Sequence, residues 1–173
     1  MVYGVIDKKS KRYYTYLKDV FAAIGNRQTE FNWLITDTEI VAHSKEVDAL
    51  NTNVQWKYES GKPVAVPAPE FYFLSGEELT AIVSQDNSQW IWGVLSGFDK
   101  SVSMEDILKY PLPESNGYEG FWKNPPSLQH PLASVEIVPW DSSLVLVLSK
   151  DKEIADSFRA AFPQSKDLSE YNA

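Results

Sequence analysis

The fold of this chain is decided by the stretch Ala133-Ser134-Val135-Glu136-Ile137-Val138-Pro139-Trp140, then Asp141-Ser142-Ser143, then Leu144-Val145-Leu146-Val147-Leu148. Apolar Val135 and Ile137 alternate with polar neighbours, which predicts a strand with one buried face. The unbroken apolar run 144–148 predicts a central strand covered on both faces. Asp and Ser between the two strands favour a turn, because their side chains bond to nearby backbone groups.

An amphipathic helix follows these two strands. Ile154, Phe158, Ala161 and Phe162 recur at spacings of three and four residues, which places them on one helical face. Pro163 is expected to end that helix. The resulting strand–turn–strand–helix unit indicates how the chain is built but carries no obvious chemistry.

The rest of the chain predicts further strands and helices around this unit. Strands are expected at 2–6, 31–36, 39–42, 54–58, 71–74 and 89–98, with 31–42 forming a hairpin around Asp37-Thr38. Helices are expected at 10–24 with Ser10 as its cap, after the capping box Ser75/Glu78, and at 103–108. Pro63, Pro67 and Pro69 predict an extended segment that pairs poorly. The sequence therefore predicts one α+β domain over 1–173, with a largely antiparallel sheet of about six strands and two or three packed helices.

Composition narrows the range of functions. The chain has no cysteine, so disulfides, thiolate nucleophiles and Cys-ligated zinc are excluded. His43 and His130 are the only histidines and lack metal-ligand spacing, and no nucleophile elbow or phosphate-binding glycine loop is present. We therefore expect neither an enzyme nor a cofactor or metal site. No signal-peptide pattern and no run of 18 apolar residues occurs, which favours a cytosolic protein without membrane association.

The formal net charge of −8 is spread unevenly. Residues 1–27 hold six Lys/Arg against two Asp/Glu, a net +4, whereas the remaining residues hold ten against 22, a net −12. Such an acidic surface repels nucleic acid, whose binding requires phosphate neutralisation by Lys and Arg. It favours a basic protein partner, or serves solubility alone.

Aromatic residues make up 13% of the chain, with six Trp, which fits either a ring-rich core or an exposed recognition surface. The irregular stretch 109–131 contains Tyr118 and Trp122, and is either a binding surface or a segment that wraps the domain. Trp90 and Trp92 are expected on one strand face, either as core or as a platform for stacking sugars.

The C-terminal third resembles the end of small acidic bacterial proteins that include immunity proteins of toxin–immunity pairs. The similar segments are 137–143, 146–153, Phe158-Arg159, Phe162-Pro163 and Asp167-Leu168-Ser169-Glu170-Tyr171-Asn172, about 40 of the 173 residues. The resemblance implies a cytosolic protein that binds and neutralises a cognate toxin, often a basic nuclease, by occluding its active site. It carries over no binding residue, because immunity surfaces vary with the toxin.

The function expected from the sequence is therefore non-enzymatic inhibition of a basic bacterial toxin domain. Acidic residues around an aromatic anchor would steer and hold the partner. The candidate binding residues are Asp37, Glu39, Glu114, Tyr118, Glu119 and Trp122. The alternatives are a small-ligand or carbohydrate-binding protein, or an enzyme, with a site between the Trp90/Trp92 face and the 109–131 loop, or an accessory protein without a separable site. The oligomeric state is left open.

Overall fold

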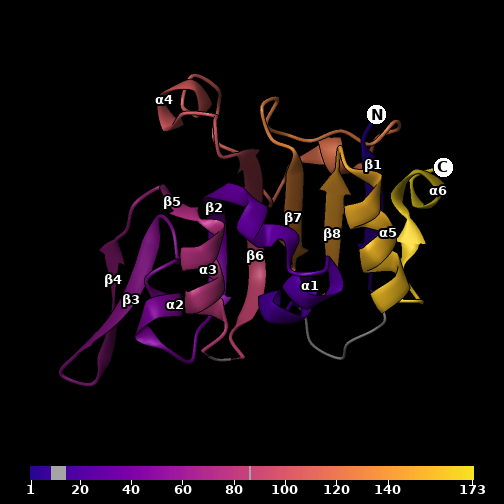
Figure 1. Ribbon diagram of the computed structural model, residues 1–173. Coiled ribbons are helices and arrows are strands. Elements are labelled where there is room, and N and C mark those ends of the chain that lie inside the picture. Colours follow the sequence, from indigo (N-terminus) through magenta and orange to yellow (C-terminus); the bar gives the residue numbers. More distant parts are fainter. Residues whose placement is uncertain (9–14, 86) are drawn as a thin grey trace.

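One seven-stranded antiparallel sheet forms the frame of the structure, a computed structural model that describes residues 1–8, 15–85 and 87–173 (Figure 1). In spatial order its strands are β5 (Phe71–Ser75), β2 (Phe31–Val41), β6 (Gln89–Asp99), β7 (Val135–Trp140), β8 (Leu144–Ser149), β1 (Tyr3–Asp7) and β9 (Lys166–Asp167). A separate two-stranded ribbon consists of β3 (Val54–Glu59) and β4 (Lys62–Pro67). All these strand pairs are antiparallel, so the predicted α+β class and sheet type are confirmed.

The helices lie between the strands along the chain. They are α1 (Leu17–Ala23), α2 (Lys45–Asp48), α3 (Gly76–Val83), α4 (Met104–Ile107), α5 (Lys152–Ala161) and α6 (Leu168–Tyr171), with 3₁₀ turns η1 (Arg27–Glu30) and η2 (Glu119–Trp122). The predicted capping box of α3 is present, since Ser75 and Glu78 each bond to the other's backbone N–H. The predicted helix over 10–24 forms only as α1, because the extended Tyr16 is its N-cap and Thr15 exchanges backbone hydrogen bonds with Trp90 of β6. The predicted cap, Ser10, lies outside the described residues.

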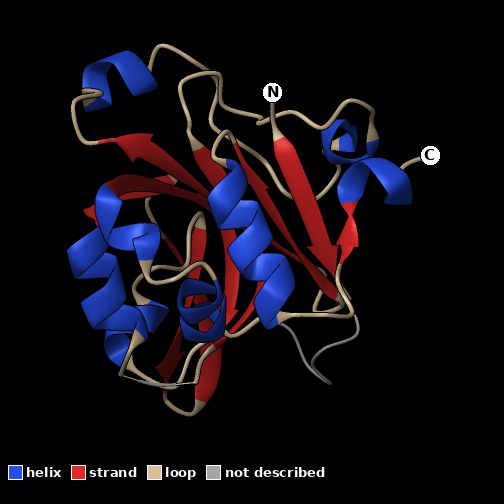
Figure 2. Ribbon diagram, turned by 45° about the vertical axis from the view of Figure 1, so that its right-hand side comes forward, coloured by secondary structure: helices blue, strands red, loops and turns tan. Residues whose placement is uncertain are grey.

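The two faces of the sheet are covered differently. Helices α1, α3 and α5 pack on one face, where they stand in front of the strands in Figure 2. Phe21, Leu79 and Phe158, one from each helix, are buried in this core. The other face is covered mainly by the 109–131 segment, which inserts Phe121 among residues of β7 and β8. This segment therefore wraps the sheet, one of the two roles expected for it.

The strand–turn–strand–helix unit forms as predicted. β7 pairs with β8 from Val135↔Ser149 to Trp140↔Leu144, and every residue of β8 is buried. Asp141 and Ser142 have φ values of 49° and 52°, as a tight hairpin turn requires. The prediction that β7 has one solvent-facing side is wrong, because the 109–131 segment covers that side and buries Glu136 completely.

The predicted hairpin over 31–42 is wrong. β2 is one continuous strand, and both of its halves pair with β6, from Phe31↔Asp99 to Val41↔Gln89. Asp37, with φ of 50°, lies in a bulge between Thr36 and Glu39. A bulge accommodates extra residues without reversing the chain, so turn-forming residues here kink a strand rather than end it.

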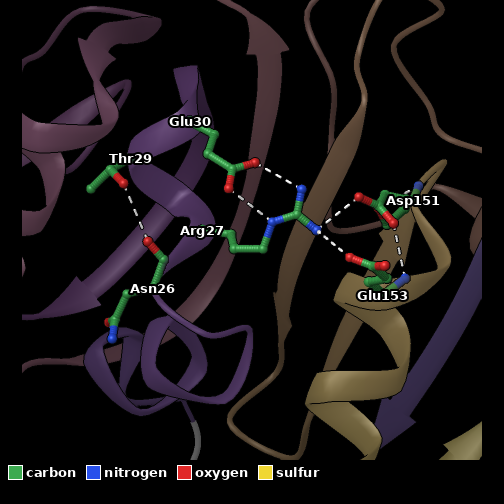
Figure 3. Close-up of polar contacts among 7 residues, drawn as sticks. Asn26, Arg27, Thr29, Glu30, Asp151 and Glu153 are labelled. Atoms are coloured by element: carbon green, nitrogen blue, oxygen red, sulfur yellow. Dashed lines mark hydrogen bonds and ion pairs between the residues drawn. The ribbon is translucent and has the colours of Figure 1, made fainter.

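Arg27 links η1, which precedes β2, to the start of α5, which follows β8 (Figure 3). Its Nε and Nη2 donate to the Glu30 carboxylate at 2.9 and 2.8 Å, and its Nη1 donates to Asp151 Oδ2 at 2.7 Å. Asp151 is also the N-cap of α5, accepting from Glu153 N at 2.9 Å. The guanidinium thus holds the start of α5 against η1, and it lowers the pKa of both Glu30 and Asp151 by hydrogen bonding.

Within the described ranges, none of the helices combines the length and apolar character needed to cross a membrane.

Candidate functional site

A large groove separates the outer half of β2 from the β3–β4 ribbon. Its volume is about 1030 Å³, and it is open to solvent. It is lined by residues 38–45, Asp48, residues 51–56 and Tyr58. We call this depression the ribbon groove.

The floor of the ribbon groove is fixed by hydrogen bonds between β2 and residues 50–52. Asn51 mimics a neighbouring strand, because its Oδ1 accepts from Ile40 N at 2.7 Å and its Nδ2 donates to Ile40 O at 3.2 Å. The buried Thr38 N donates to Thr52 Oγ1 at 2.9 Å, and Thr52 N donates to Thr38 Oγ1 at the same distance. The edge of β2 beyond its pairing with β5 is therefore already occupied.

The ribbon presents an apolar face to solvent. Val54, Trp56 and Tyr58 alternate along β3 and are 45%, 64% and 77% exposed. Their direct partners on β4 are Pro67, Ala65 and Pro63, which are also exposed. Side chains at alternate positions share a face, so these six residues form one continuous apolar surface. We call it the ribbon face.

A second, smaller depression lies beside the ribbon groove and shares Asn53 with it. Its volume is about 490 Å³. Three carboxylates, from Asp37, Glu70 and Glu114, line it, and no Lys or Arg is among the described residues that line it. We call it the acidic hollow. Together the two depressions present a negative surface beside the ribbon.

Asp37 builds the acidic hollow by clamping the 109–131 segment to the β2 bulge. Its Oδ2 accepts from Ser115 N and Ser115 Oγ, both at 2.6 Å, and from Asn116 N at 3.2 Å. Ser115 is fully buried at this junction. One residue predicted as a partner contact thus also has a structural task, which is to bring Glu114 to β2 from far along the chain.

The structure brings together three of the six predicted binding residues. Asp37 and Glu114 line the acidic hollow, and Glu39 lines the ribbon groove. The other three, Tyr118, Glu119 and Trp122, belong to the η2 region and line neither depression.

Two of these three are packing residues. Tyr118 contacts Phe121 edge-on with ring centroids 4.7 Å apart, and Trp122 contacts Trp140 at 5.1 Å. Glu119 is exposed. The residues that sequence reasoning missed are Trp56 and Tyr58, whose alternation predicted a strand but not which side of it would stay uncovered.

The prediction that Trp90 and Trp92 lie on the same face of their strand is wrong. Trp90 is buried in the core beneath the helices, whereas Trp92 contacts Trp140, a residue packed on the opposite core. The register shift between Glu39 and Ile40 of β2 interrupts the alternation of β6 between the two rings. Neither ring lines either depression.

Glu136 is a buried carboxylate under the 109–131 segment. Its Oε2 accepts from Gln129 N at 2.8 Å, while its Oε1 accepts from His130 N at 2.9 Å and from Ser96 Oγ at 3.2 Å. Burial nevertheless raises the pKa of the carboxyl to about 7, and these donors and the charge of Lys150 oppose the shift. Glu136 therefore ties the end of the long segment to the central sheet.

His130 next to Glu136 is also buried, and its tautomer is fixed. Nδ1 accepts from Leu132 N at 3.2 Å, so Nε2 carries the proton and donates to Ile107 O at 3.0 Å. Burial lowers the pKa of this imidazole. His130 is therefore a locally bonded side chain of the packed interior.

Over residues 1–8, 15–85 and 87–173, no three His, Asp or Glu side chains are grouped so that they could hold a metal ion. No protein-family model, curated protein sequence or solved structure matches the chain. The geometry of the groove, the hollow and the ribbon face therefore carries the functional interpretation.

Proposed function

We propose that this protein binds a basic protein partner at the ribbon groove and acidic hollow and occludes it. In line with the resemblance of the C-terminal third to immunity proteins, the partner is a bacterial toxin domain met in the cytosol. The observation that carries the proposal is an exposed apolar ribbon face beside two depressions with excess negative charge.

The exposed rings favour a protein partner. Large apolar side chains that remain together in solvent mark interaction surfaces, and Trp and Tyr dominate the binding energy of such surfaces. Trp56 and Tyr58 are the most exposed rings in the described part of the chain. Because they lie on a ribbon outside the main sheet, they support none of the hydrophobic cores.

The charges favour a basic partner. Among the described residues, two carboxylates, Glu39 and Asp48, and one Lys, Lys45, line the ribbon groove. Three carboxylates line the acidic hollow. The net charge of −8 has the same sign as this local surface. Complementary charge of this kind accelerates association and suppresses wrong partners.

A small polar ligand is the second candidate occupant of the ribbon groove. The volume of about 1030 Å³ is at the upper end of the roughly 300–1,000 Å³ of small-molecule sites. Trp56 offers a flat ring on which such a ligand would stack. Thermal unfolding with and without a panel of sugars tests this candidate, which a rise in melting temperature would support.

Removal of the ribbon rings is expected to weaken partner binding at least tenfold. The test uses the product of the neighbouring gene, because immunity genes lie beside their toxin genes, and measures both affinity and rescue of bacterial growth. Trp56→Ala and Tyr58→Ala should each raise Kd about tenfold or more, the range of interface hot spots. Met104→Ala is the control, since Met104 is 46% exposed on α4, away from the groove. No complex and no growth rescue would overturn the proposed function.

Charge reversal at the two depressions is expected to slow association. In the double variant Glu39→Lys/Glu114→Lys, kon should fall about tenfold at low salt, and its salt dependence should weaken. Glu119→Lys is the matched control for each of the single variants Glu39→Lys and Glu114→Lys, because it makes the same charge change on η2, outside both depressions. An equal loss of kon in Glu119→Lys would move the interface to the η2 region.

A further inference from the structure

We propose that the outer edge of β3 accepts an extended basic segment of the partner as an additional strand. This inference rests on the proposed function, and it specifies how the partner occupies the ribbon groove. Three observations support it: the strand register of the ribbon, the prolines of β4, and the hydrogen bonds by which Asn51 already satisfies the backbone of Ile40 across the groove.

The register decides which peptide groups of β3 point toward the groove. The ribbon closes at Glu59↔Lys62 around Ser60-Gly61, whose φ values are 50° and 77°. In a two-residue hairpin the pair of residues that closes the loop is hydrogen bonded. Along the strands from that pair, non-hydrogen-bonded and hydrogen-bonded pairs alternate. The peptide groups of positions 54, 56 and 58 therefore point away from β4. Consistent with this, Val54 N donates to Thr52 O at 2.7 Å rather than to β4.

The prolines make the two edges of the ribbon unequal. Pro63 and Pro67 face Tyr58 and Val54, so their nitrogens lie on the outer edge of β4. Proline has no N–H, and proline on an edge strand prevents further pairing. The outer edge of β3 has no proline, and among the described residues no strand pairs with it. Only the β3 edge is therefore competent to receive another strand.

The open edge faces the ribbon groove. Val54, Trp56 and Tyr58 line the groove, whereas no residue of β4 does. On the opposite wall, the backbone of Ile40 is already satisfied by Asn51. A chain entering the groove can thus form main-chain hydrogen bonds with β3 and none with Ile40. When a peptide adds to a sheet edge in this way, main-chain hydrogen bonds provide the affinity, and contacts of its side chains provide the specificity.

The charges select the occupant. A second copy of this chain carries the same net charge of −8 and is repelled, whereas the carboxylates of Glu39 and Asp48, which outnumber the one Lys among the described residues that line the groove, Lys45, attract Lys or Arg side chains. Alternate residues of an added strand point to opposite sides. A segment in which basic and apolar residues alternate therefore satisfies the groove carboxylates and the ribbon face together.

The test is hydrogen exchange of the ¹⁵N-labelled protein, followed by NMR, with a blocked octapeptide of alternating Lys and Val at millimolar concentration. The amides of Trp56 and Tyr58 should become at least tenfold more protected. The amide of Lys57 is the internal control, because it is already paired within the ribbon. An octapeptide of alternating Glu and Val should give no protection. Binding without protection at 56 and 58, or no perturbation of β3, would overturn strand addition.

A matched pair of variants isolates the backbone contribution. Trp56→Ala and Trp56→Pro both remove the ring, but only the proline removes the N–H that points to the groove. Proline at this position is compatible with the ribbon, since Pro63 and Pro67 hold equivalent positions on β4. We expect Trp56→Pro to bind the Lys/Val peptide at least tenfold more weakly than Trp56→Ala. Equal affinities would overturn strand addition, while the growth-rescue test judges the proposed function separately.

Discussion

Between pH 4.5 and pH 8, ionisation of Glu136 is expected to remove about 3 kcal/mol from the free energy of unfolding. Burial raises the pKa of this carboxyl from 4.5 to about 7 in the folded protein. Between these two pKa values the folded state holds a proton that the unfolded state has released. The contribution is therefore complete below pH 4.5 and is lost as the pH rises through 7.

His130 acts in the opposite direction over part of the same range. Its folded pKa lies below its ordinary value of 6.5, so the unfolded state binds the additional proton. Stability from this group is lost as the pH falls below 6.5 and grows as the pH rises. The profile of the unmodified protein is thus a sum of two opposed terms, and only a variant separates them.

The Glu136→Gln variant provides that separation. The test is to measure its free energy of unfolding by urea denaturation from pH 4.5 to 8.5. With increasing pH, this free energy should no longer show the decrease due to Glu136 and should still show the increase due to His130. Its absolute stability should be lower at acid pH, because the amide nitrogen cannot accept from Gln129 N or His130 N. A ¹³C titration of the Glu136 carboxyl is the direct check, and a midpoint near 4.5 would contradict the prediction.

Asp37→Ala is expected to lower the free energy of unfolding by about 3 kcal/mol. Loss of the hydrogen bonds that Asp37 Oδ2 accepts costs roughly 1.5–3 kcal/mol in total, because the buried Ser115 Oγ keeps the backbone oxygen of residue 37 as an acceptor at 3.3 Å. The φ of 50° adds roughly 1–2 kcal/mol, because alanine keeps the Cβ that crowds the following carbonyl but lacks the polar side chain whose local hydrogen bonds offset this strain in aspartate. Denaturation experiments measure the total loss.

Asp37→Asn is the matched control for this prediction. Asparagine tolerates positive φ and keeps one side-chain oxygen acceptor, so we expect a loss of only about 1 kcal/mol. Hydrogen exchange over residues 112–118 should rise strongly in the alanine variant and slightly in the asparagine variant. Equal stability of the two variants would show that Asp37 does not clamp the segment to β2.

The sequence alone predicted those elements whose signal lies within a few residues. The apolar run at 144–148 indicated β8, the three- and four-residue spacing from Ile154 indicated α5, and the Ser75/Glu78 pair indicated the start of α3. These patterns work because the preference of a short segment for a strand, helix or cap depends mainly on its own residues. The α+β class followed from them.

The candidate site could be predicted only in part. Carboxylates at Asp37, Glu39 and Glu114 were suggested by charge alone, yet their assembly depends on a hydrogen bond between Asp37 and Ser115, 78 positions apart. The exposure of Trp56 and Tyr58 depends on no other element covering the ribbon face. No short sequence pattern predicts the assembly of these carboxylates or the exposure of the two rings. Each depends on whether a segment distant in the sequence packs against these residues.

The same physical reason explains the wrong predictions. Asp37-Thr38 resembles a turn, but both halves of β2 find partners on β6, so the chain continues through a bulge. Glu136 alternates as a solvent-facing residue, but the 109–131 segment covers that face and supplies donors for its carboxylate. The sequence by itself indicated most strands and helices and the sign of the surface charge, but its prediction of poor pairing for the proline-rich segment is wrong, because β4 pairs with β3 over its whole length. Tertiary structure decided which faces are covered, because burial is a property of two segments packed together and not of either one.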